Sequence, residues 1–291
     1  MKNRIAFGQN RILPPFFPAT HRNDFSIRRT KQNMIQPLTI RGVTIGEGIP
    51  KVIVPIVETS REAILKKAEE LSSLDIQMVE WRADFYEDSL CETETLRTLA
   101  GLRKQLGGIP LLFTFRTAQE GGVRPIDPGA YASLNGAVAS SGDADVVDVE
   151  VFSSGERAKE SIDAIHAAGA FVIGSNHDHH ATPDREELVS RLRRIQQLGA
   201  DIAKVAVMPQ SKADVLTLLA ATLEMYENYA DRPIITMSMA PMGVLSRISG
   251  EVFGSSMTFG TVGGLSAPGQ IPIGELQSCL RILHGASGDT D

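Results

Sequence analysis

Short apolar runs alternate along the chain with longer segments in which apolar residues recur every three or four positions. The short runs are rich in Val and Ile and predict strands. They lie at residues 51–57, 76–84, 111–116, 146–151, 171–176, 202–207, 234–239 and 256–259. Eight strand–helix units in succession predict an α/β fold, a (β/α)8 TIM barrel. In such a barrel the site lies at the carboxyl ends of the strands.

Local signals mark the predicted helices. Thr59-Ser-Arg-Glu62 reads as a capping box, and it precedes a helix with one apolar face, formed by Ile64, Leu65, Ala68 and Leu71. A less regular helix is expected near residues 92–106. Thr182 and Pro183 predict the N-cap and first residue of a helix that ends at Gly199.

The first part of the chain differs from this pattern. Residues 38–40 and 43–45 flank Arg41-Gly42 and predict a β-hairpin that closes the bottom of the barrel. Residues 1–33 hold seven Lys or Arg and one Asp, without the apolar segment of a secretory signal. We expect residues 1–34 to be a disordered basic leader, and residues 35–291 a single barrel domain. This leader resembles a transit peptide in composition, but Met34 could equally be an alternative start.

Composition restricts the functional class. Beyond residue 33 the chain carries 22 basic and 34 acidic side chains, which argues against nucleic acid as the main partner. No apolar run reaches about 18 residues, so no membrane span is predicted. Cys91 and Cys279 give neither a disulfide framework nor metal-ligand spacing. These features favour a reducing compartment, and we expect a cytoplasmic protein.

Lys204 is the most informative single residue. It lies in the predicted strand 202–207, where Ala203, Val205 and Val207 alternate with Ile202, Lys204 and Ala206. A lysine in a buried strand either extends its ammonium group to water or loses its charge through burial. In the second case the neutral amine can attack a carbonyl and form a Schiff base. The strand alone leaves both interpretations open.

Other strands place polar side chains on one face. Glu80, Arg82 and Asp84 alternate with apolar neighbours, as do Asp148 and Glu150. Arg116 ends its strand, and His177 shares a face with Ser175. A structural salt-bridge ladder would explain any one of these strands. Their recurrence at several carboxyl ends favours a catalytic site.

Five segments together resemble the type I 3-dehydroquinate dehydratases. They are Glu80-Trp-Arg-Ala-Asp84, Ser175-Asn-His-Asp178, the Lys204 strand, Ser246-Arg-Ile-Ser-Gly-Glu-Val-Phe-Gly254 and Ser266-Ala-Pro-Gly-Gln270. The resemblance extends from about residue 37 to residue 284. It implies a (β/α)8 barrel, a homodimer, and dehydration of 3-dehydroquinate to 3-dehydroshikimate in the shikimate pathway. No metal or organic cofactor is expected, and neither nucleic acid nor a membrane is an expected partner.

The resemblance also assigns roles. Lys204 would form an imine with the substrate ketone, and His177 would remove a C2 proton and then protonate the departing C1 hydroxyl. Glu120 would orient His177, and Arg247 would bind the substrate carboxylate. Four further residues would bind ring hydroxyls, namely Glu80, Arg82, Arg116 and Gln270. Ser266 and Gln270 lie in a glycine-rich loop that would close over the substrate as a lid.

Three positions depart from the family pattern. Pro55 stands where serine is frequent, His179 replaces an aromatic residue, and Pro241-Met242 replaces a polar pair. None of these residues is assigned to imine formation or proton transfer.

Three other functions fit parts of the sequence. His177-Asp-His-His180 could belong to a metal-dependent barrel hydrolase, although the arginines at the other strand ends would repel a cation. A class I aldolase would use the same imine chemistry to cleave a carbon–carbon bond. A catalytically silent sensor would bind a small molecule without turnover.

Overall fold

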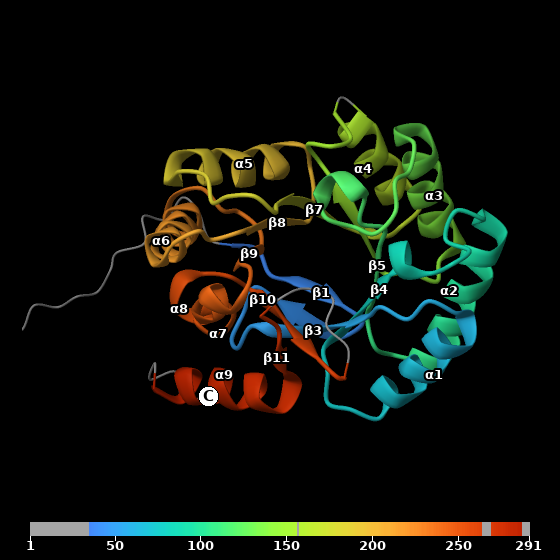
Figure 1. Cartoon of the computed structure of the whole chain (residues 1–291), viewed down its shortest axis with the longest axis horizontal. Helices are drawn as coiled ribbons and strands as arrows, with labels where there is room; N and C mark the ends of the chain where they lie inside the picture. Colours follow the sequence, from blue (N-terminus) through green and yellow to red (C-terminus); the bar gives the residue numbers. More distant parts are fainter. Residues whose placement is uncertain (1–34, 156, 264–268, 287–291) are drawn as a thin grey trace, which may run out of the picture.

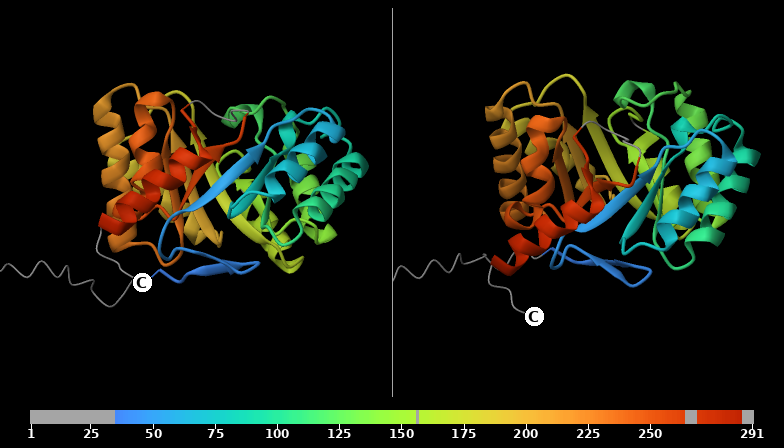
Figure 2. Two further views of the ribbon diagram at one scale, coloured as in Figure 1. Left: turned by 90° about the horizontal axis from the view of Figure 1, so that it is seen from below. Right: turned by 60° about the horizontal axis from the view of Figure 1, so that its bottom comes forward.

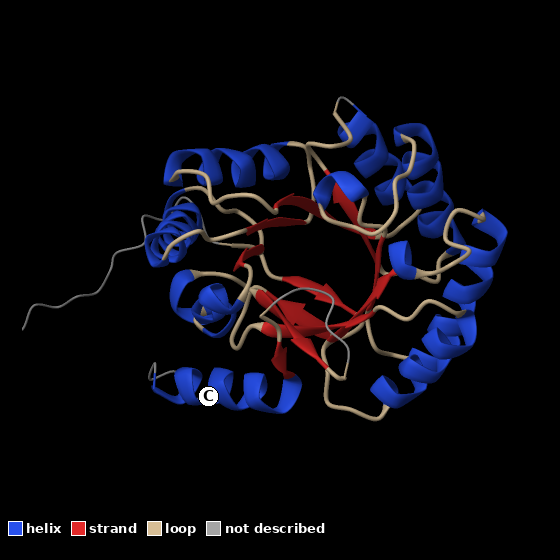
Figure 3. Ribbon diagram, viewed as in Figure 1, coloured by secondary structure: helices blue, strands red, loops and turns tan. Residues whose placement is uncertain are grey.

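Eight parallel strands form a ring, and helices surround it (Figures 1 and 3). The computed structural model describes residues 35–155, 157–263 and 269–286. The fold predicted from the sequence is confirmed. The barrel strands are β3 (Lys51–Ile56), β4 (Met78–Arg82), β5 (Leu111–Thr114), β6 (Val146–Glu150), β7 (Phe171–Asp178), β8 (Ile202–Val207), β9 (Ile234–Ser238) and β10 (Met257–Thr261).

The ring closes between β9 and β10. A parallel bridge joins Ile234 to Ser255, and the Ser256 amide donates to the Ile234 carbonyl at 2.8 Å. A further strand of two residues, β11 (Ile271–Pro272), pairs in parallel with β10. The sequence pattern did not predict β11, because so short a run carries no detectable period.

Seven longer helices lie outside the ring in the described part of the chain. They are α1 (Arg61–Ser72), α2 (Glu92–Leu106), α3 (Pro128–Ser141), α4 (Arg157–Ala167), α5 (Arg185–Gln197), α6 (Lys212–Asn228) and α9 (Ile273–Ala286). Between β9 and β10 the chain instead forms η3 (Pro241–Gly243), α7 (Val244–Ile248) and α8 (Gly250–Phe253). Two further 3₁₀ turns, η1 (Ala83–Phe85) and η2 (Ala118–Glu120), follow β4 and β5. None of the described helices is both long and apolar enough to cross a bilayer.

Two predicted helix starts were wrong. Ser60, not Thr59, caps α1, and its hydroxyl accepts from the Ala63 amide at 3.3 Å. Helix α5 begins after Asp184, whose carboxylate accepts from the Glu187 amide at 2.8 Å. The expected cap, Thr182, instead donates its hydroxyl to the Met208 carbonyl at 3.1 Å. Its side chain is therefore engaged by the segment after β8 and is not available as a cap.

Alternate residues of each strand enter one of two apolar cores. The outer core lies between sheet and helices and includes Trp81 and Phe113, whose rings meet edge to face at 5.5 Å. The inner core fills the lower barrel with one side chain from each strand: Ile53, Met78, Leu112, Val146, Ile173, Ile202, Ile235 and Met257. This layering is the usual filling of such a barrel.

The predicted hairpin closes the bottom of this inner core (Figure 2). It consists of β1 (Leu38–Ile40) and β2 (Val43–Ile45), which are antiparallel. Arg41 and Gly42 form its turn with φ of 46° and 81°, as a type I′ turn requires. Ile40 and Ile45 are buried against the inner core. With apolar side chains filling the bottom, the polar residues of the strands gather at the opposite, carboxyl end.

Candidate active site

A pocket of about 550 Å³ opens at the carboxyl ends of the strands. It brings together eight of the nine site residues predicted from the sequence: Glu80, Arg82, Arg116, Glu120, His177, Lys204, Arg247 and Gln270. The ninth, Ser266, lies outside the described residues, as do the other residues of the segment 264–268 in the predicted lid, residues 260–270. The remaining lining residues are Gly121, His179, Ala206, Met237, Met239 and Phe259.

Lys204 extends into this pocket from the middle of β8. It shares the inner face with Ile202 and Ala206, while its neighbours on the strand pack in the outer core. Only 4% of Lys204 is exposed. Its Nζ lies 3.5 Å from Asp148 Oδ2 and 4.7 Å from the centre of the Phe259 ring. Burial lowers the Lys204 pKa more than Asp148 and Glu80 raise it, which favours the neutral, nucleophilic amine.

His177 and Glu120 form a pair beside this amine. Glu120 Oε2 lies 2.9 Å from His177 Nδ1 and also accepts the His177 backbone amide at 2.9 Å. A charged carboxylate at this position places the imidazole proton on Nδ1 and leaves Nε2 as a free base. Burial, together with the positive charges of Arg116 and Lys204, holds the pKa of His177 well below its usual value. The imidazole is therefore neutral at rest.

Glu120 owes its position to a tight turn after β5. It is the last residue of η2, and Gly121 follows in the left-handed conformation. The carboxylate is buried, and Ser153 donates its hydroxyl to Oε1 at 2.7 Å. Burial and the nearby charge of Glu150 raise the Glu120 pKa to about 7, although Arg116 and the Ser153 hydrogen bond lower it.

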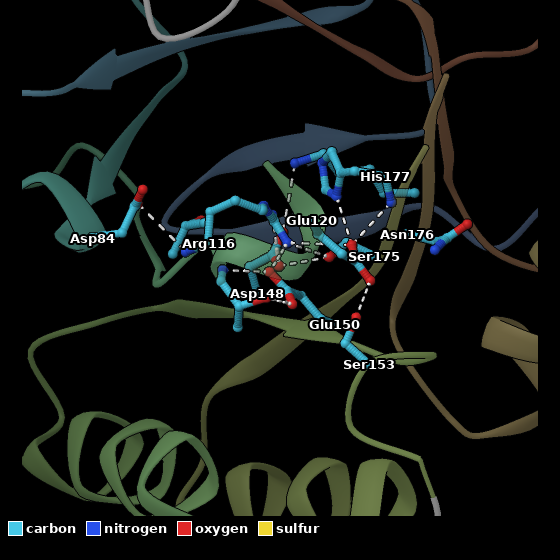
Figure 4. A network of polar contacts seen from close by, with 12 residues as sticks. Asp84, Arg116, Glu120, Asp148, Glu150, Ser153, Ser175, Asn176 and His177 are labelled. Carbon is cyan, nitrogen blue, oxygen red and sulfur yellow. Dashed lines mark hydrogen bonds and ion pairs between the residues drawn. The ribbon is translucent and has the colours of Figure 1, made fainter. Parts of the chain in front are cut away.

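Arg116, which lines the pocket, connects β6 and β7 (Figure 4). One terminal nitrogen contacts Glu150 at 2.9 Å and Ser175 at 3.1 Å, and the other contacts Asp148 at 2.9 Å. Burial lowers the Arg116 pKa, but the surrounding carboxylates raise it well above its usual value. The pKa of Asp148 is in turn lowered, because Arg116 and Lys204 outweigh the effect of burial. The guanidinium thus holds a permanent positive charge between the carboxylates.

Neighbouring residues also hold the two side chains of β4 that line the pocket, Glu80 and Arg82. Glu80 accepts a hydrogen bond from the Thr114 hydroxyl at 2.9 Å. Arg82 donates through two nitrogens to Asp84, both at 2.8 Å, which is the bidentate geometry that arginine favours. Asp84 is fully buried and also accepts the Val123 amide at 3.3 Å. It therefore links the end of β4 to the loop after β5.

Arg247 approaches from α7 on another side of the pocket. Its side chain is buried, and a terminal nitrogen lies 2.9 Å from the Met237 sulfur. Burial lowers its pKa to about 10. An anion bound in this pocket would stabilise the charged guanidinium. Met237, Met239 and Phe259 provide the apolar surface around it.

Several residues that hold the site had no predicted role. Asp148 and Glu150 were noted only because they alternate with valines. Ser175 was noted because it shares a strand face with His177 and belongs to one of the family segments. Ser153 carried no signal, because it lies in a turn without periodicity. His179 was noted as a departure, and its ring stacks on that of His177 at 6.3 Å between centroids. Among the residues that the structure describes, no group of three His, Cys, Asp or Glu is arranged to hold a metal ion.

Sequence comparison identifies relatives of the whole chain. The model of the type I 3-dehydroquinase family matches residues 52–287. A 3-dehydroquinate dehydratase of Bacillus licheniformis is 52% identical over 245 residues, which cover 84% of this chain and 96% of the relative. A 3-dehydroquinate dehydratase of Salmonella paratyphi B is 47% identical over 252 residues, covering 87% of this chain and all of the relative (100%).

Solved structures agree. The type I 3-dehydroquinate dehydratase of Clostridium difficile, with covalently modified comenic acid, has a TM-score of 0.84 and 48% identity. The alignment covers 87% of this chain and 100% of that one. The 3-dehydroquinate dehydratase of Geobacillus kaustophilus also gives a TM-score of 0.84, at 38% identity and with 87% and 98% coverage.

Proposed function

The chain belongs to the type I 3-dehydroquinase family, and from this premise we propose that it dehydrates 3-dehydroquinate to 3-dehydroshikimate through an imine on Lys204. It is then a hydro-lyase, a carbon–oxygen lyase of the shikimate pathway, which leads to chorismate and the aromatic amino acids. One observation carries the mechanism: a buried amine and a His–Glu pair face the same pocket. In the β7–β8 ladder Lys204 pairs with Ser175 and His177 pairs with Ala206, so the amine and the imidazole lie on adjacent strands.

The first step is attack of the neutral Lys204 amine on the C3 ketone. The carbinolamine that forms loses water and gives an iminium ion, which draws electrons from C2 and acidifies its protons. Asp148 lies 3.5 Å from the nitrogen, and its negative charge stabilises the positive iminium. A lowered lysine pKa favours this step because more of the amine is neutral at working pH.

The second step is elimination. His177 Nε2 takes a C2 proton, and the electron pair moves to the iminium to form an enamine. The enamine then expels the C1 hydroxyl, which leaves as water with the proton from His177. Hydrolysis of the product imine consumes one water and frees Lys204, so that the net loss is one water. Glu120 keeps the imidazole proton on Nδ1 and stabilises the imidazolium formed in the middle of this sequence.

Substrate binding follows the positions of the remaining pocket residues. Arg247 is proposed to bind the substrate carboxylate, for which a buried guanidinium offers a planar, charge-assisted partner. The ring hydroxyls are assigned by family resemblance to Glu80, Arg82, Arg116 and Gln270, and Ser266 is assigned to substrate binding from the lid. Because both terminal nitrogens of Arg116 already contact protein groups, we assign it mainly to holding the carboxylates and charges beneath the substrate.

We also propose a cytoplasmic homodimer without nucleic-acid or membrane partners. Exposed apolar side chains gather on α6, η3, α7 and α8, which pack on one another. They are Leu216, Met242, Val244, Leu245 and Val252. Exposed apolar side chains on neighbouring elements are typical of a subunit interface. Sedimentation at micromolar concentration, with Leu245→Glu as the disrupting variant, would test this assembly.

Trapping with borohydride tests the covalent step. Borohydride added with 3-dehydroquinate should reduce the imine, inactivate the enzyme and leave a ligand-derived mass on Lys204. A mass on Lys212, the next lysine along the chain, or no added mass would contradict the assignment. Formation of the conjugated enone, followed by its ultraviolet absorbance, reports turnover in the same sample. Carbon–carbon cleavage would instead indicate an aldolase.

The variant His177→Ala separates proton transfer from imine formation. Dehydration should fall by about 10²–10⁴-fold, the usual contribution of a general acid and base. The complex at Lys204 should remain reducible, although more slowly, because imine formation also needs proton transfers. Arg247→Ala is the matched comparison and should weaken substrate binding while leaving the imine accessible at high substrate concentration. Near wild-type turnover by His177→Ala would mean that another residue, such as His179, is the base.

A further inference from the structure

Each oxygen of the Glu120 carboxylate has its own set of contacts. Oε2 makes two hydrogen bonds with His177, one with Nδ1 and one with the backbone amide. Oε1 accepts the Ser153 hydroxyl at 2.7 Å. Ser153 comes from the turn between β6 and α4, so it reaches Glu120 from an element that carries none of the groups that would contact substrate (Figure 4).

Ser153 lies outside the substrate pocket. It lines a second, smaller cavity next to Glu150, together with Thr117, Tyr131 and the neighbouring Ser154. The Thr117 hydroxyl donates to Glu150 at 2.6 Å on this side. Hydroxyl groups on this side therefore hold the carboxylates of Glu120 and Glu150, of which Glu120 lines the substrate pocket. A change at Ser153 alters this support without altering the surface that meets the substrate.

We propose that Ser153 is a positioning residue that fixes the Glu120 carboxylate in the orientation His177 requires and favours its charged form. The inference rests on the proposed function, since it gives Ser153 a part in the chemistry assigned to His177. A carboxylate with only one oxygen held can rotate about its Cγ–Cδ bond and leave Nδ1. A hydrogen bond to the ionised form also stabilises that form over the protonated one.

The charge state of Glu120 matters because it decides the tautomer of His177. A protonated Glu120 can donate to Nδ1, and the imidazole proton then sits on Nε2, where it blocks C2 deprotonation. The Ser153 hydrogen bond counteracts burial and the charge of Glu150, which together raise the Glu120 pKa to about 7. Without it the pKa rises further. The other ionisable groups that face Glu120 come from the segments after β5 and β7 and from β6 and β7 themselves: Arg116, Asp148, Glu150, His177 and His179.

The experiment compares Ser153→Ala, Ser153→Thr and Ser153→Val, with Ser154→Ala as the matched control in the same turn. Thr and Val have nearly the same shape, so this pair compares a hydroxyl with a methyl group at a residue that lines the second cavity. Loss of the hydroxyl should lower kcat about tenfold near pH 7 and leave KM nearly unchanged. The acid limb of the kcat profile should move to higher pH, so that the loss becomes smaller in alkaline buffer. Ser153→Thr should restore activity and Ser153→Val should not.

A second measurement needs no turnover. The ¹⁵N shifts of the His177 ring distinguish the two tautomers, and their pH dependence should shift upward in Ser153→Ala and Ser153→Val only. Wild-type kinetics in both variants would overturn the proposal, as would an equal loss at every pH accompanied by a lower melting temperature. If the unaltered protein failed to dehydrate 3-dehydroquinate, the proposed function would fall, while the ring shifts would still decide whether Ser153 controls the Glu120–His177 pair.

Discussion

Single residues at the mouth of the barrel take their charge states from burial and from one another. Glu120 and His177 are both buried, and burial moves their pKa values in opposite directions, upward for the acid and downward for the base. At neutral pH the imidazole is uncharged, and the position of its proton follows the charge of Glu120. The pair therefore makes the proposed activity depend on pH through the acid rather than through the histidine.

We predict that dehydration falls as pH decreases through about 7, the pKa of Glu120. Below this value the carboxyl is protonated, and His177 holds its proton on the nitrogen that should accept one. The measurement is kcat against pH for the unaltered protein and for Glu120→Gln, which cannot titrate. The variant should be slow, by about 10²-fold or more, and should lack this acid limb. Glu186→Gln, an exposed substitution on α5, is the control. An unchanged limb in Glu120→Gln would assign it to another group.

The residues to which we assign chemistry could be named from the sequence and its family resemblance, whereas most of the residues that hold them in place could not. The faces of Lys204, Glu80 and Arg82 follow from strand alternation. Successive side chains of a strand point to opposite sides, so residues that alternate with the apolar set must point into the barrel. The contacts of Arg116 could not be predicted, because they depend on which carboxylates of β6 the folded barrel places next to the segment after β5. Ser153 was missed for the same reason, since a turn residue has no period and its partner is 33 positions away.

At the scale of elements, the loop after β5 decides where Glu120 lies. Gly121 has φ of 82°, and a Cβ there would come within 2.2 Å of His179 Nε2. A Cβ on Gly122 would lie 1.9 Å from the Arg116 carbonyl oxygen, which is backbone and cannot move aside cheaply. The turn after η2 is therefore restricted to glycine by direct contact, not only by conformation.

We predict that Gly122→Ala displaces this loop, lowers the free energy of unfolding by about 1–3 kcal/mol and lowers dehydration more than substrate binding. Urea unfolding and steady-state kinetics on one preparation would measure both. Gly136→Ala is the matched control, because it lies in α3 with nothing within 4 Å of the added methyl group. That substitution should leave activity unchanged and raise stability by up to about 1 kcal/mol. Wild-type activity in Gly122→Ala would show that the turn tolerates displacement.

Elements differed in how well the sequence predicted them. The strands and the hairpin were placed within a few residues, because apolar alternation and a two-residue turn are local properties. The starts of α1 and α5 were misplaced, since a cap depends on which nearby side chain is free. Thr182 had a suitable side chain, but the Met208 carbonyl engages it. The short α7 and α8 were not predicted, because four or five residues carry no period.

At the scale of the whole molecule, the barrel divides into a closed bottom and an open, reactive top. The hairpin seals the bottom with Ile40 and Ile45, and Arg41 forms a 2.6 Å ion pair with Asp145 near the start of β6. Apolar packing at one end leaves the other end free to gather buried charges, whose pairing would contribute little to stability by itself. Stability and chemistry are thus assigned to opposite ends of the same strands, and they should respond separately to mutation.

A chain that begins at Met34 should fold and dehydrate 3-dehydroquinate as the full chain does. It keeps Ile35, which packs against the outer core, and Gln36, whose amide donates to the Asp231 carbonyl at 2.9 Å. All of the predicted site residues lie beyond it. The measurements are melting temperature and kcat/KM for both chains. Ile45→Ala is the reference for a loss of stability at this end of the barrel, because it shortens a buried side chain. It should lower the free energy of unfolding by about 2–5 kcal/mol and leave kcat unchanged. If removal of residues 1–33 lowered stability as much as Ile45→Ala does, these residues would have to pack on the barrel, and the division into a separate leader and a barrel would be wrong.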